Sequence, residues 1–266
     1  MKLAADLVRC PVCHKGFLSI RGETTARCGT CHAEFQVKDG VIDLLPQTQH
    51  NSGFAQRLME KPWLVRIYES RMWRRNPLAE AAIGCSFEEE QAHVIRALSL
   101  RPDARVLDLA CGPGNYTRPL ARALPHGTAI GLDISQPMIS FAASRANDEG
   151  ISNIVWLRAS ALDLPFEDAS LDGVNCCGAL HLFPDIPRVL AGIFRTLKPG
   201  GRFVSGMGRR FDGQLAGLQT FITDRIGLTI FSSTELAALL KDAGFSDVKV
   251  NHAKRIWQIV SAVRER

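Results

Sequence analysis

The sequence predicts an α/β protein, in which a doubly wound, mostly parallel sheet of seven strands follows a small cysteine-bearing segment. Three observations lead to this expectation. From residue 105 onward, short apolar stretches alternate with helical stretches, an order typical of parallel sheets. A glycine loop joins the first apolar stretch to the first helix. Two Cys-x-x-Cys pairs precede this region, at residues 10–13 and 28–31.

The composition is that of an ordinary globular protein. The chain has 266 residues, 46% hydrophobic and 22% charged, long enough for one large domain or a main domain with a small appendage. The net charge of +5 is too small to indicate nucleic-acid binding on its own. The N-terminus MKLAADLVRC lacks a signal-peptide core, and no apolar run is long enough for a membrane span. We therefore expect a cytoplasmic protein with reduced thiols and no membrane segment.

The string C-x-x-C-H occurs twice and admits three interpretations: covalent haem attachment, a redox dithiol, or half of a zinc site. Haem attachment normally takes place outside the cytoplasm, and a redox dithiol explains one pair but not two. Four thiolates on two tight turns can surround one tetrahedral ion, so we expect a structural zinc ribbon over residues 1–46. His14 and His32 could each substitute as a ligand, although four cysteines already fill the ion. The expected zinc ligands are Cys10, Cys13, Cys28 and Cys31.

Short strands account for the rest of the ribbon. Residues 16–27 are interpreted as a hairpin with Gly22 at its turn. The stretch AEFQVKDGVIDLLP is interpreted as a second strand pair around Asp39 and Gly40. The polar stretch PQTQHN then breaks the pattern and marks the expected boundary of the ribbon.

Residues 47–100 are interpreted as a helical linker or lid. Apolar residues recur at helical spacing in the stretches 63–75 and 87–100, so a helix is expected in each. Ser86 and Glu89 have the spacing of a capping box at the start of the second helix.

The main domain is expected over residues 101–266. Its last two strands follow each other with no helix between them, so one of them is expected to run antiparallel. The expected strands are 105–111, 128–134, 154–160, 171–180, 202–208, 246–253 and 256–264. The expected helices are 115–125, 136–150, 185–201, ending at Pro-Gly-Gly, and 233–244, capped by Ser233 or Thr234 and ended by Gly244.

The glycine loop DLACGPGNYT lies where open parallel sheets bind ligands, at the carboxyl end of the first strand. Gly112 and Gly114 allow the backbone to come close to a ligand. Thr117 stands where a dinucleotide-binding loop would carry its third glycine. Asp133 ends the second strand, 19 residues after Gly114, and is well placed for a ribose diol.

The stretches VLDLACGPGNYTRPLA, AIGLDIS, LRASALDLPFEDASLDGV and LKPGGRF resemble the class I S-adenosylmethionine-dependent methyltransferases, in the branch with quinone-type and sterol-type enzymes. The resemblance covers roughly residues 100–265 and implies a Rossmann-like fold. With its ribbon, the chain is also similar to bacterial ribosomal-RNA guanine-N1 methyltransferases. A third similarity is to plastid and bacterial methyltransferases of uncertain substrate, whose GAALH-type motif is close to CGALHLFPD at 177–185.

The resemblance implies where S-adenosylmethionine binds. The residues implied along its methionine part are Asp108, Ala110, Cys111, Gly112 and Gly114. Those implied around its ribose and adenine are Asp133 on the ribose hydroxyls, with Ile134, Met138, Ala161, Leu162 and Asp163 at the adenine. Cys177 and Gly178 are implied to lie near the sulfonium and the acceptor. The alternative is structural, with glycines that only make turns and aspartates that only cap local backbone.

The expected acceptor is a small aromatic or polyketide-like molecule, methylated on oxygen or, as the second choice, on carbon. In the family, amine and nucleobase-amine methyltransferases often carry an Asn/Asp-Pro-Pro-aromatic motif after the fourth strand. This sequence reads CCGALHLF there, so a nucleobase amine is disfavoured as the acceptor. His181 in that stretch is the candidate general base, and the alternative is a histidine that contacts the cofactor or only packs. The candidate acceptor contacts, with core packing as the alternative, are Tyr68, Trp73, Phe211 and Phe221.

Three other functions stay open at this stage. The ribbon and the Arg-rich segment 66–75 suit RNA, so a ribosomal-RNA base methyltransferase is the second choice. A non-catalytic scaffold whose ribbon binds a partner protein is the third, although the glycine loop and Asp133 argue against it. The last is a cofactor-binding enzyme of another reaction type.

Overall fold

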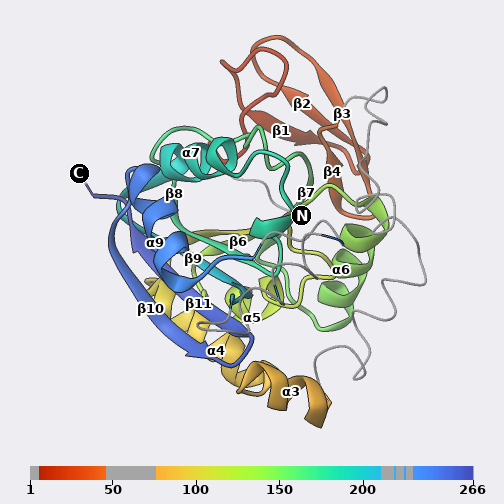
Figure 1. The fold of residues 1–266 in the computed structure, drawn as a ribbon. Helices are drawn as coiled ribbons and strands as arrows, with labels where there is room; N and C mark the ends of the chain where they lie inside the picture. Colours follow the sequence, from red (N-terminus) through yellow and green to blue (C-terminus); the bar gives the residue numbers. More distant parts are fainter. Residues whose placement is uncertain (1–5, 46–75, 211–218, 220–224, 226–229, 266) are drawn as a thin grey trace.

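The computed structural model describes residues 6–45, 76–210, 219, 225 and 230–265. Within these residues, eleven strands form one sheet in the order β1-β2-β3-β4-β7-β6-β5-β8-β9-β11-β10. The last seven strands in this order are the predicted core sheet, and the first four come from the N-terminal segment, at the upper right of Figure 1. The fold class expected from the sequence is therefore confirmed.

Five core strands run parallel, because each is connected to the next through a crossover. They are β5 (Arg105–Leu109), β6 (Thr128–Asp133), β7 (Ile154–Arg158), β8 (Leu171–Cys177) and β9 (Leu197–Gly208). The last two strands, β10 (Ser246–Lys254) and β11 (Trp257–Val263), pair with each other, and β11 pairs antiparallel with β9. The expected antiparallel end of the sheet is confirmed.

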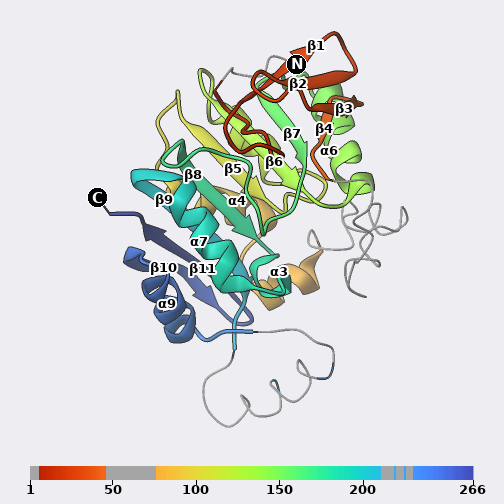
Figure 2. The same ribbon diagram turned by 90° about the horizontal axis from the view of Figure 1, so that it is seen from above.

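Helices cover both faces of the core sheet (Figures 1 and 2). On one face, α7 (Ile186–Thr196) and α9 (Ser233–Asp242) share a hydrophobic cluster with the N-terminal segment. On the other face, α4 (Phe87–Leu98), α5 (Thr117–Arg122) and α6 (Gln136–Asp148) share a second cluster. Alternate residues of the central strands enter each cluster, as in Val106 and Leu107, so the strands are apolar on both sides.

The predicted capping box of α4 is confirmed. The hydroxyl of Ser86 accepts a hydrogen bond from the amide of Glu89, and the Glu89 carboxylate accepts one from the amide of Ser86. A short helix, α3 (Pro77–Ile83), precedes α4. The helix expected over 63–75 lies outside the described residues.

The helix expected over 185–201 was predicted too long. α7 ends at Thr196, and the chain enters β9 directly at Leu197. Proline disfavours helical backbone in the residue before it, so the chain has left the helix by Lys198, before Pro199. Pro-Gly-Gly thus lies within the strand segment, where Gly200 donates its amide to the carbonyl of Arg264.

Two smaller corrections concern α9 and α5. The cap of α9 is Ser232, not Ser233 or Thr234, because the Ser232 hydroxyl accepts from the amide of Glu235 and the Glu235 carboxylate accepts from the amide of Ser232. α5 is shorter than the expected 115–125, since it covers Thr117–Arg122 only.

The N-terminal segment consists of four antiparallel strands, β1 (Leu18–Arg21), β2 (Thr25–Cys28), β3 (Glu34–Lys38) and β4 (Val41–Asp43). The two predicted turns, at Gly22 and at Asp39-Gly40, are confirmed by positive φ angles at these residues. The sequence did not predict that β4 pairs in parallel with β7, in the register Val41↔Trp156 to Asp43↔Arg158. The N-terminal sheet is therefore continuous with the core sheet (Figure 2). Among the described residues, no helix has the length and apolar character needed to cross a membrane.

Candidate cofactor site and cysteine cluster

The glycine loop leaves β5 with three residues at positive φ: Ala110, Gly112 and Gly114. A Cβ on Gly112 would meet no atom within 4 Å, so the loop borders open space at this position. A Cβ on Gly114 would lie 2.9 Å from the Trp156 ring and 3.0 Å from the Ala142 Cβ. Gly114 is therefore required by packing of the loop against its own protein, a reason that the sequence did not indicate.

Asp108, near the end of β5, is buried beneath the loop. Its carboxylate accepts hydrogen bonds from the Thr117 hydroxyl, at 2.5 Å, and from the Asn175 side-chain amide, at 2.8 Å. Burial raises the pKa of Asp108 to about 6, against the opposing effect of these two donors. Both carboxylate oxygens of Asp108 thus accept hydrogen bonds from protein side chains, and these bonds connect β5 to α5 and β8.

Asp133 ends β6, beside the loop, and is also buried. One carboxylate oxygen accepts from the amide of Gly112 and the other from the amide of Ser135, each at 2.8 Å. Burial raises the pKa of Asp133, and these amides oppose the shift. Each oxygen has a further lone pair, so the carboxylate can still accept from a diol.

The residues expected around an adenine lie after β6 and β7. Met138 is buried on α6, and Ile134 is half-buried. Ala161 and Leu162 are half-buried in the loop after β7, and the Leu162 carbonyl accepts from the Arg188 side chain at 2.9 Å. Asp163 is exposed and lines a cavity of about 160 Å³ between this loop and the N-terminal segment.

The residues after β8 border a second open space. A Cβ on Gly178 would meet no atom within 4 Å, and the Cys177 thiol donates to the Asn175 side-chain carbonyl at 3.1 Å. His181 lies in the short 3-10 helix η1 (Leu180–Leu182). Its Nδ1 is buried without a hydrogen-bond partner among the described residues. Burial lowers the pKa of His181 to about 4, so its ring is neutral at neutral pH.

The structure thus brings the predicted cofactor residues to the carboxyl ends of neighbouring strands β5, β6, β7 and β8. Cys111 is buried, and burial raises the pKa of its thiol, so this side chain packs rather than reacts. The predicted acceptor contacts Tyr68, Trp73, Phe211 and Phe221 lie outside the described residues. Sequence reasoning missed Asn175, although a polar residue in an apolar strand is a usable signal because buried polar groups are normally hydrogen-bonded.

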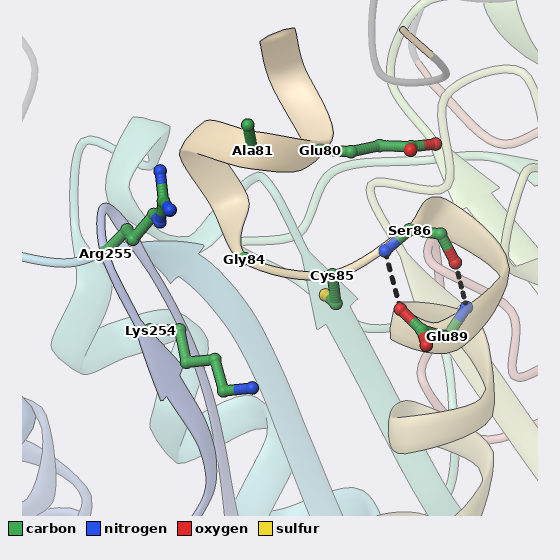
Figure 3. A pocket seen from close by; sticks show the side chains of 8 residues that line it. All are labelled: Glu80, Ala81, Gly84, Cys85, Ser86, Glu89, Lys254 and Arg255. Atoms are coloured by element: carbon green, nitrogen blue, oxygen red, sulfur yellow. Dashed lines mark hydrogen bonds between the residues drawn. The ribbon is translucent and has the colours of Figure 1, made fainter. Parts of the chain in front are cut away.

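A second, open cavity of about 650 Å³ lies between α3, the start of α4 and the turn from β10 to β11. Figure 3 shows Lys254 at the end of β10 and Arg255 just after it, across the cavity from α3 and from the Ser86–Glu89 capping box. The lining is polar and of mixed charge, which differs from the mostly apolar lining typical of small-molecule sites.

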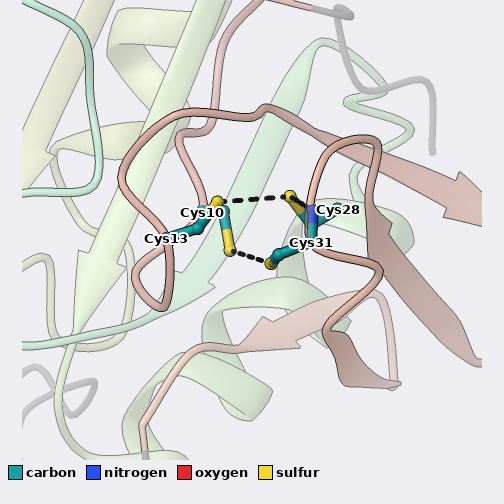
Figure 4. Close-up of side chains that lie close together, drawn as sticks. All are labelled: Cys10, Cys13, Cys28 and Cys31. Atoms are coloured by element: carbon teal, nitrogen blue, oxygen red, sulfur yellow. Dashed lines mark hydrogen bonds between the residues drawn. The ribbon is translucent and has the colours of Figure 1, made fainter.

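The four N-terminal cysteines form a compact cluster (Figure 4). Their sulfur atoms all lie within 4.8 Å of one another, and the pairs Cys10–Cys31 and Cys13–Cys28 are each 3.7 Å apart. Thiolates at about 2.3 Å from a tetrahedral zinc ion are about 3.8 Å apart. The cluster therefore has the size of a four-thiolate zinc site. No histidine joins it among the described residues, in agreement with the expected ligand set.

Backbone amides around the cluster favour the thiolate form of Cys13 in particular. The amides of Lys15 and Gly16 lower the pKa of Cys13 to about 6, whereas burial raises the pKa of Cys10 to about 12. The amides of Thr30 and Cys31 point at the Cys28 sulfur, at 3.4 and 3.5 Å. Amide donors around the sulfurs are suited to the negative charge of thiolate ligands.

Comparison with known proteins agrees with this geometry. Residues 106–201 match the family described as methyltransferase domain. A demethylmenaquinone methyltransferase of Lactiplantibacillus plantarum is 34% identical over 143 residues, which cover 53% of this chain and 53% of the relative. An uncharacterized chloroplastic methyltransferase of Arabidopsis thaliana is 28% identical over 73% of this chain and 60% of its own. The chain therefore spans between half and two thirds of the length of these relatives.

A solved structure shows the same fold. The crystal structure of an S-adenosylmethionine-dependent methyltransferase from Aquifex aeolicus superposes with a TM-score of 0.59 at 18% identity. The superposition covers 76% of this chain and 97% of the Aquifex chain. Residues 106–201 therefore match the methyltransferase-domain family, and the chain shares the fold of the Aquifex methyltransferase.

Proposed function

We propose that the protein transfers a methyl group from S-adenosylmethionine to a small quinone-type acceptor. The observation that carries the proposal is the link between Gly112 and Asp133, which sets a backbone amide and a carboxylate beside open space. The acceptor class is supported by the relative named demethylmenaquinone methyltransferase. The relatives reported above give no support to a ribosomal-RNA substrate or to a non-catalytic scaffold.

The residues fit the cofactor in three respects. The space beside Gly112 and Gly178 is open, so backbone there can approach a ligand closely. The Asp133 carboxylate can accept from ribose hydroxyls while it keeps its two amide donors. The half-buried Ile134 offers apolar surface for the adenine, and we assign the buried Met138 to the same side of the site. When bound, S-adenosylmethionine supplies an electrophilic methyl group, and the protein aligns the acceptor with it.

In this proposal, the glycine loop is held in place by the hydrogen bonds of Asp108 with Thr117 and Asn175. Their hydrogen bonds fix the start of the loop, and the Asp108 carboxylate has both oxygens engaged within the protein. We assign to these residues the orientation of the loop that lies along the methionine part of the cofactor. Ala110 and Cys111 contribute backbone there, in line with the positive φ of Ala110.

His181 is the proposed general base. Its ring is neutral at neutral pH because burial disfavours the charged form, and a neutral imidazole keeps one ring nitrogen that can accept a proton. A general base after β8 could remove a proton from a hydroxyl of the acceptor, as O-methylation requires; O-methylation is the reaction expected from the sequence. It suits equally the removal of an acidic C–H proton, which would lead to methylation on carbon.

We also propose that the cysteine cluster holds a structural zinc ion. Its support is the size of the cluster and its purely thiolate ligand set. Four zinc–thiolate bonds would stabilise an N-terminal segment whose strands are only three to five residues long.

Calorimetric titration of the zinc-loaded protein with S-adenosylmethionine and S-adenosylhomocysteine tests the cofactor assignment. We expect dissociation constants in the micromolar range, and no binding would overturn the assignment. Incubation with reduced naphthoquinones, followed by mass spectrometry and NMR of the product, tests the acceptor and identifies the methylated atom. Methylation of ribosomal-RNA fragments in place of the quinols would overturn the acceptor class.

A further inference from the structure

We propose that Arg158 is a positioning residue through which the N-terminal ribbon holds the nucleoside side of the cofactor site. The inference rests on the proposed binding of S-adenosylmethionine. It assigns to the ribbon a function in cofactor affinity, carried by the contact of Arg158 with Asp43.

Arg158 stands between the ribbon and the segment that carries Asp133. Its Nη1 donates to the Asp43 carboxylate on β4 at 2.8 Å, and its Nε donates to the Ile134 carbonyl at 3.2 Å. Ile134 directly follows Asp133, whose carboxylate holds the amides of Gly112 and Ser135. The Arg158 guanidinium therefore joins β4 of the ribbon to Ile134, the neighbour of Asp133, which is proposed to bind the ribose hydroxyls.

The backbone around this contact is ordered by the same two strands. Asp43 and Arg158 are directly paired in the parallel ladder of β4 and β7, and the Leu44 amide donates to the Arg158 carbonyl at 2.9 Å. Without the ribbon, β7 would be an edge strand of the core sheet, with its outer backbone groups unpaired. The ribbon thus completes the strand at whose end Arg158 lies.

A second contact of the ribbon is with the loop after β7, which is proposed to line the adenine. The Arg9 amide of the ribbon donates to the Pro165 carbonyl at 2.8 Å, in the loop that follows β7. This loop contains Ala161 and Leu162, which the proposed function assigns to the adenine. The ribbon therefore contacts both segments that enclose the nucleoside, after β6 through Arg158 and after β7 through Arg9.

The Asp43–Arg158 ion pair should affect the position of the segment around Asp133 more than the stability of the fold. Both side chains are partly exposed, at 25% for Arg158 and 30% for Asp43, and ion pairs in such surroundings contribute little to folding. The guanidinium is planar and donates in fixed directions, so holding one edge on Asp43 orients the other edge toward Ile134. Loss of Asp43 would release the Ile134 carbonyl and, with it, the orientation of Asp133.

The chain offers a matched control. Asp6 forms an ion pair with Arg105 through two hydrogen bonds of 3.0 Å each. It also joins the N-terminal segment to a core strand, but Arg105 lies at the start of β5, at the opposite end from the glycine loop. Asp43→Asn and Asp6→Asn therefore each remove one ion pair between ribbon and core, and only Asp43 is linked to the cofactor site.

The experiment measures S-adenosylhomocysteine affinity by calorimetry, with melting temperature and zinc content, for the wild type, Asp43→Asn, Asp6→Asn, Arg158→Met and the Asp43→Asn/Arg158→Met double variant. We expect Asp43→Asn and Arg158→Met each to weaken binding roughly three- to tenfold, and the double variant to add little, as for residues that act as a unit. Asp6→Asn should bind as the wild type does. Asp43→Glu, which keeps the carboxylate, should recover most of the affinity.

Other results would overturn the inference. Equal affinity of Asp43→Asn and the wild type would show that the pair does not position the site. Equal weakening by Asp6→Asn and Asp43→Asn, in step with their melting temperatures, would show a general effect of ribbon detachment. A wild type that binds no S-adenosylhomocysteine would overturn the proposed function together with the inference, whereas normal wild-type binding with no effect of Asp43→Asn would overturn the inference alone.

Discussion

The amide of Gly112 donates a hydrogen bond to the Asp133 carboxylate over 2.8 Å, and this contact joins the glycine loop after β5 to the end of β6. The two residues are 21 positions apart in the sequence; Gly112 lies in the loop after β5, and Asp133 is the last residue of the neighbouring parallel strand β6. The contact sets the distance between the loop and the carboxylate before any ligand arrives. A site built in this way is preorganised, so its affinity should depend on the geometry of Asp133 as well as on its charge.

Asp133→Asn should weaken S-adenosylhomocysteine binding by more than about tenfold, since a charged hydrogen-bond acceptor contributes roughly 1.5–3 kcal/mol. The amide side chain keeps one acceptor oxygen but replaces the other with a donor that faces a backbone amide. Calorimetric titration measures the effect. Asp148→Asn, an exposed position on α6, is the control and should bind normally. Unchanged affinity in Asp133→Asn would contradict the assignment of Asp133 to the ribose.

Thr117→Val should destabilise the fold by about 1–3 kcal/mol, because it leaves a buried carboxylate without one of its two side-chain donors. The same loss should raise the pKa of Asp108 further, since the Thr117 hydroxyl lowers it. Denaturant unfolding at neutral pH gives the free energy of unfolding. Thr117→Ser keeps the hydroxyl and should remain close to the wild type. If both variants lost the same stability, the hydrogen bond to Asp108 would not be the cause.

The core strands and the boundaries that depend on local signals were predictable from the sequence. All seven strands, the Ser86–Glu89 capping box and the turn at Gly22 follow from periodicity and from residues whose chemistry acts over a few positions. The misplaced end of α7 was also a local matter, because the preference of Pro199 for a non-helical predecessor was readable in advance.

The contacts that join distant segments were not predictable in the same way. The pairing of β4 with β7 and the ion pair of Asp43 with Arg158 link positions 115 residues apart, and no local pattern fixes which strand edge a short ribbon strand meets. The reason for Gly114 was missed likewise, because its neighbour Trp156 comes from a strand more than one crossover away. A glycine pattern indicates that space is needed but does not say whether a ligand or a side chain fills it.

Removal of the proposed zinc ion should destabilise the N-terminal segment. Cys28→Ser takes one thiolate from the cluster and should lower both the zinc content of the purified protein and its melting temperature. Elemental analysis and calorimetric unfolding provide the two measurements. Cys85→Ser, between α3 and α4 and outside the cluster, should retain the full zinc content. A wild type that contains no zinc after expression in zinc-supplemented medium would contradict the proposal.

The burial of His181 should appear in the pH dependence of stability. Its pKa falls from about 6.5 in an unfolded chain to about 4 in the folded protein, because burial disfavours the charged ring. Between these two values the unfolded state binds more protons than the folded state, so stability is lost as the pH falls from about 6.5 toward 4. Asp108 acts in the opposite direction: its pKa is raised to about 6, so it favours the folded state as the pH falls below that value.

A comparison of the wild type with His181→Gln separates the two groups, because the contribution of Asp108 is common to both proteins. Denaturant unfolding between about pH 4.5 and 7 should show the wild type losing roughly 1–3 kcal/mol relative to the variant as the pH falls. His126→Gln replaces an exposed histidine and should follow the wild-type curve. A constant difference between wild type and His181→Gln across this range would mean that the His181 ring is solvated in the folded protein. A solvated ring would be protonated in part of this range, and its proposed action as a neutral base would then be restricted to higher pH.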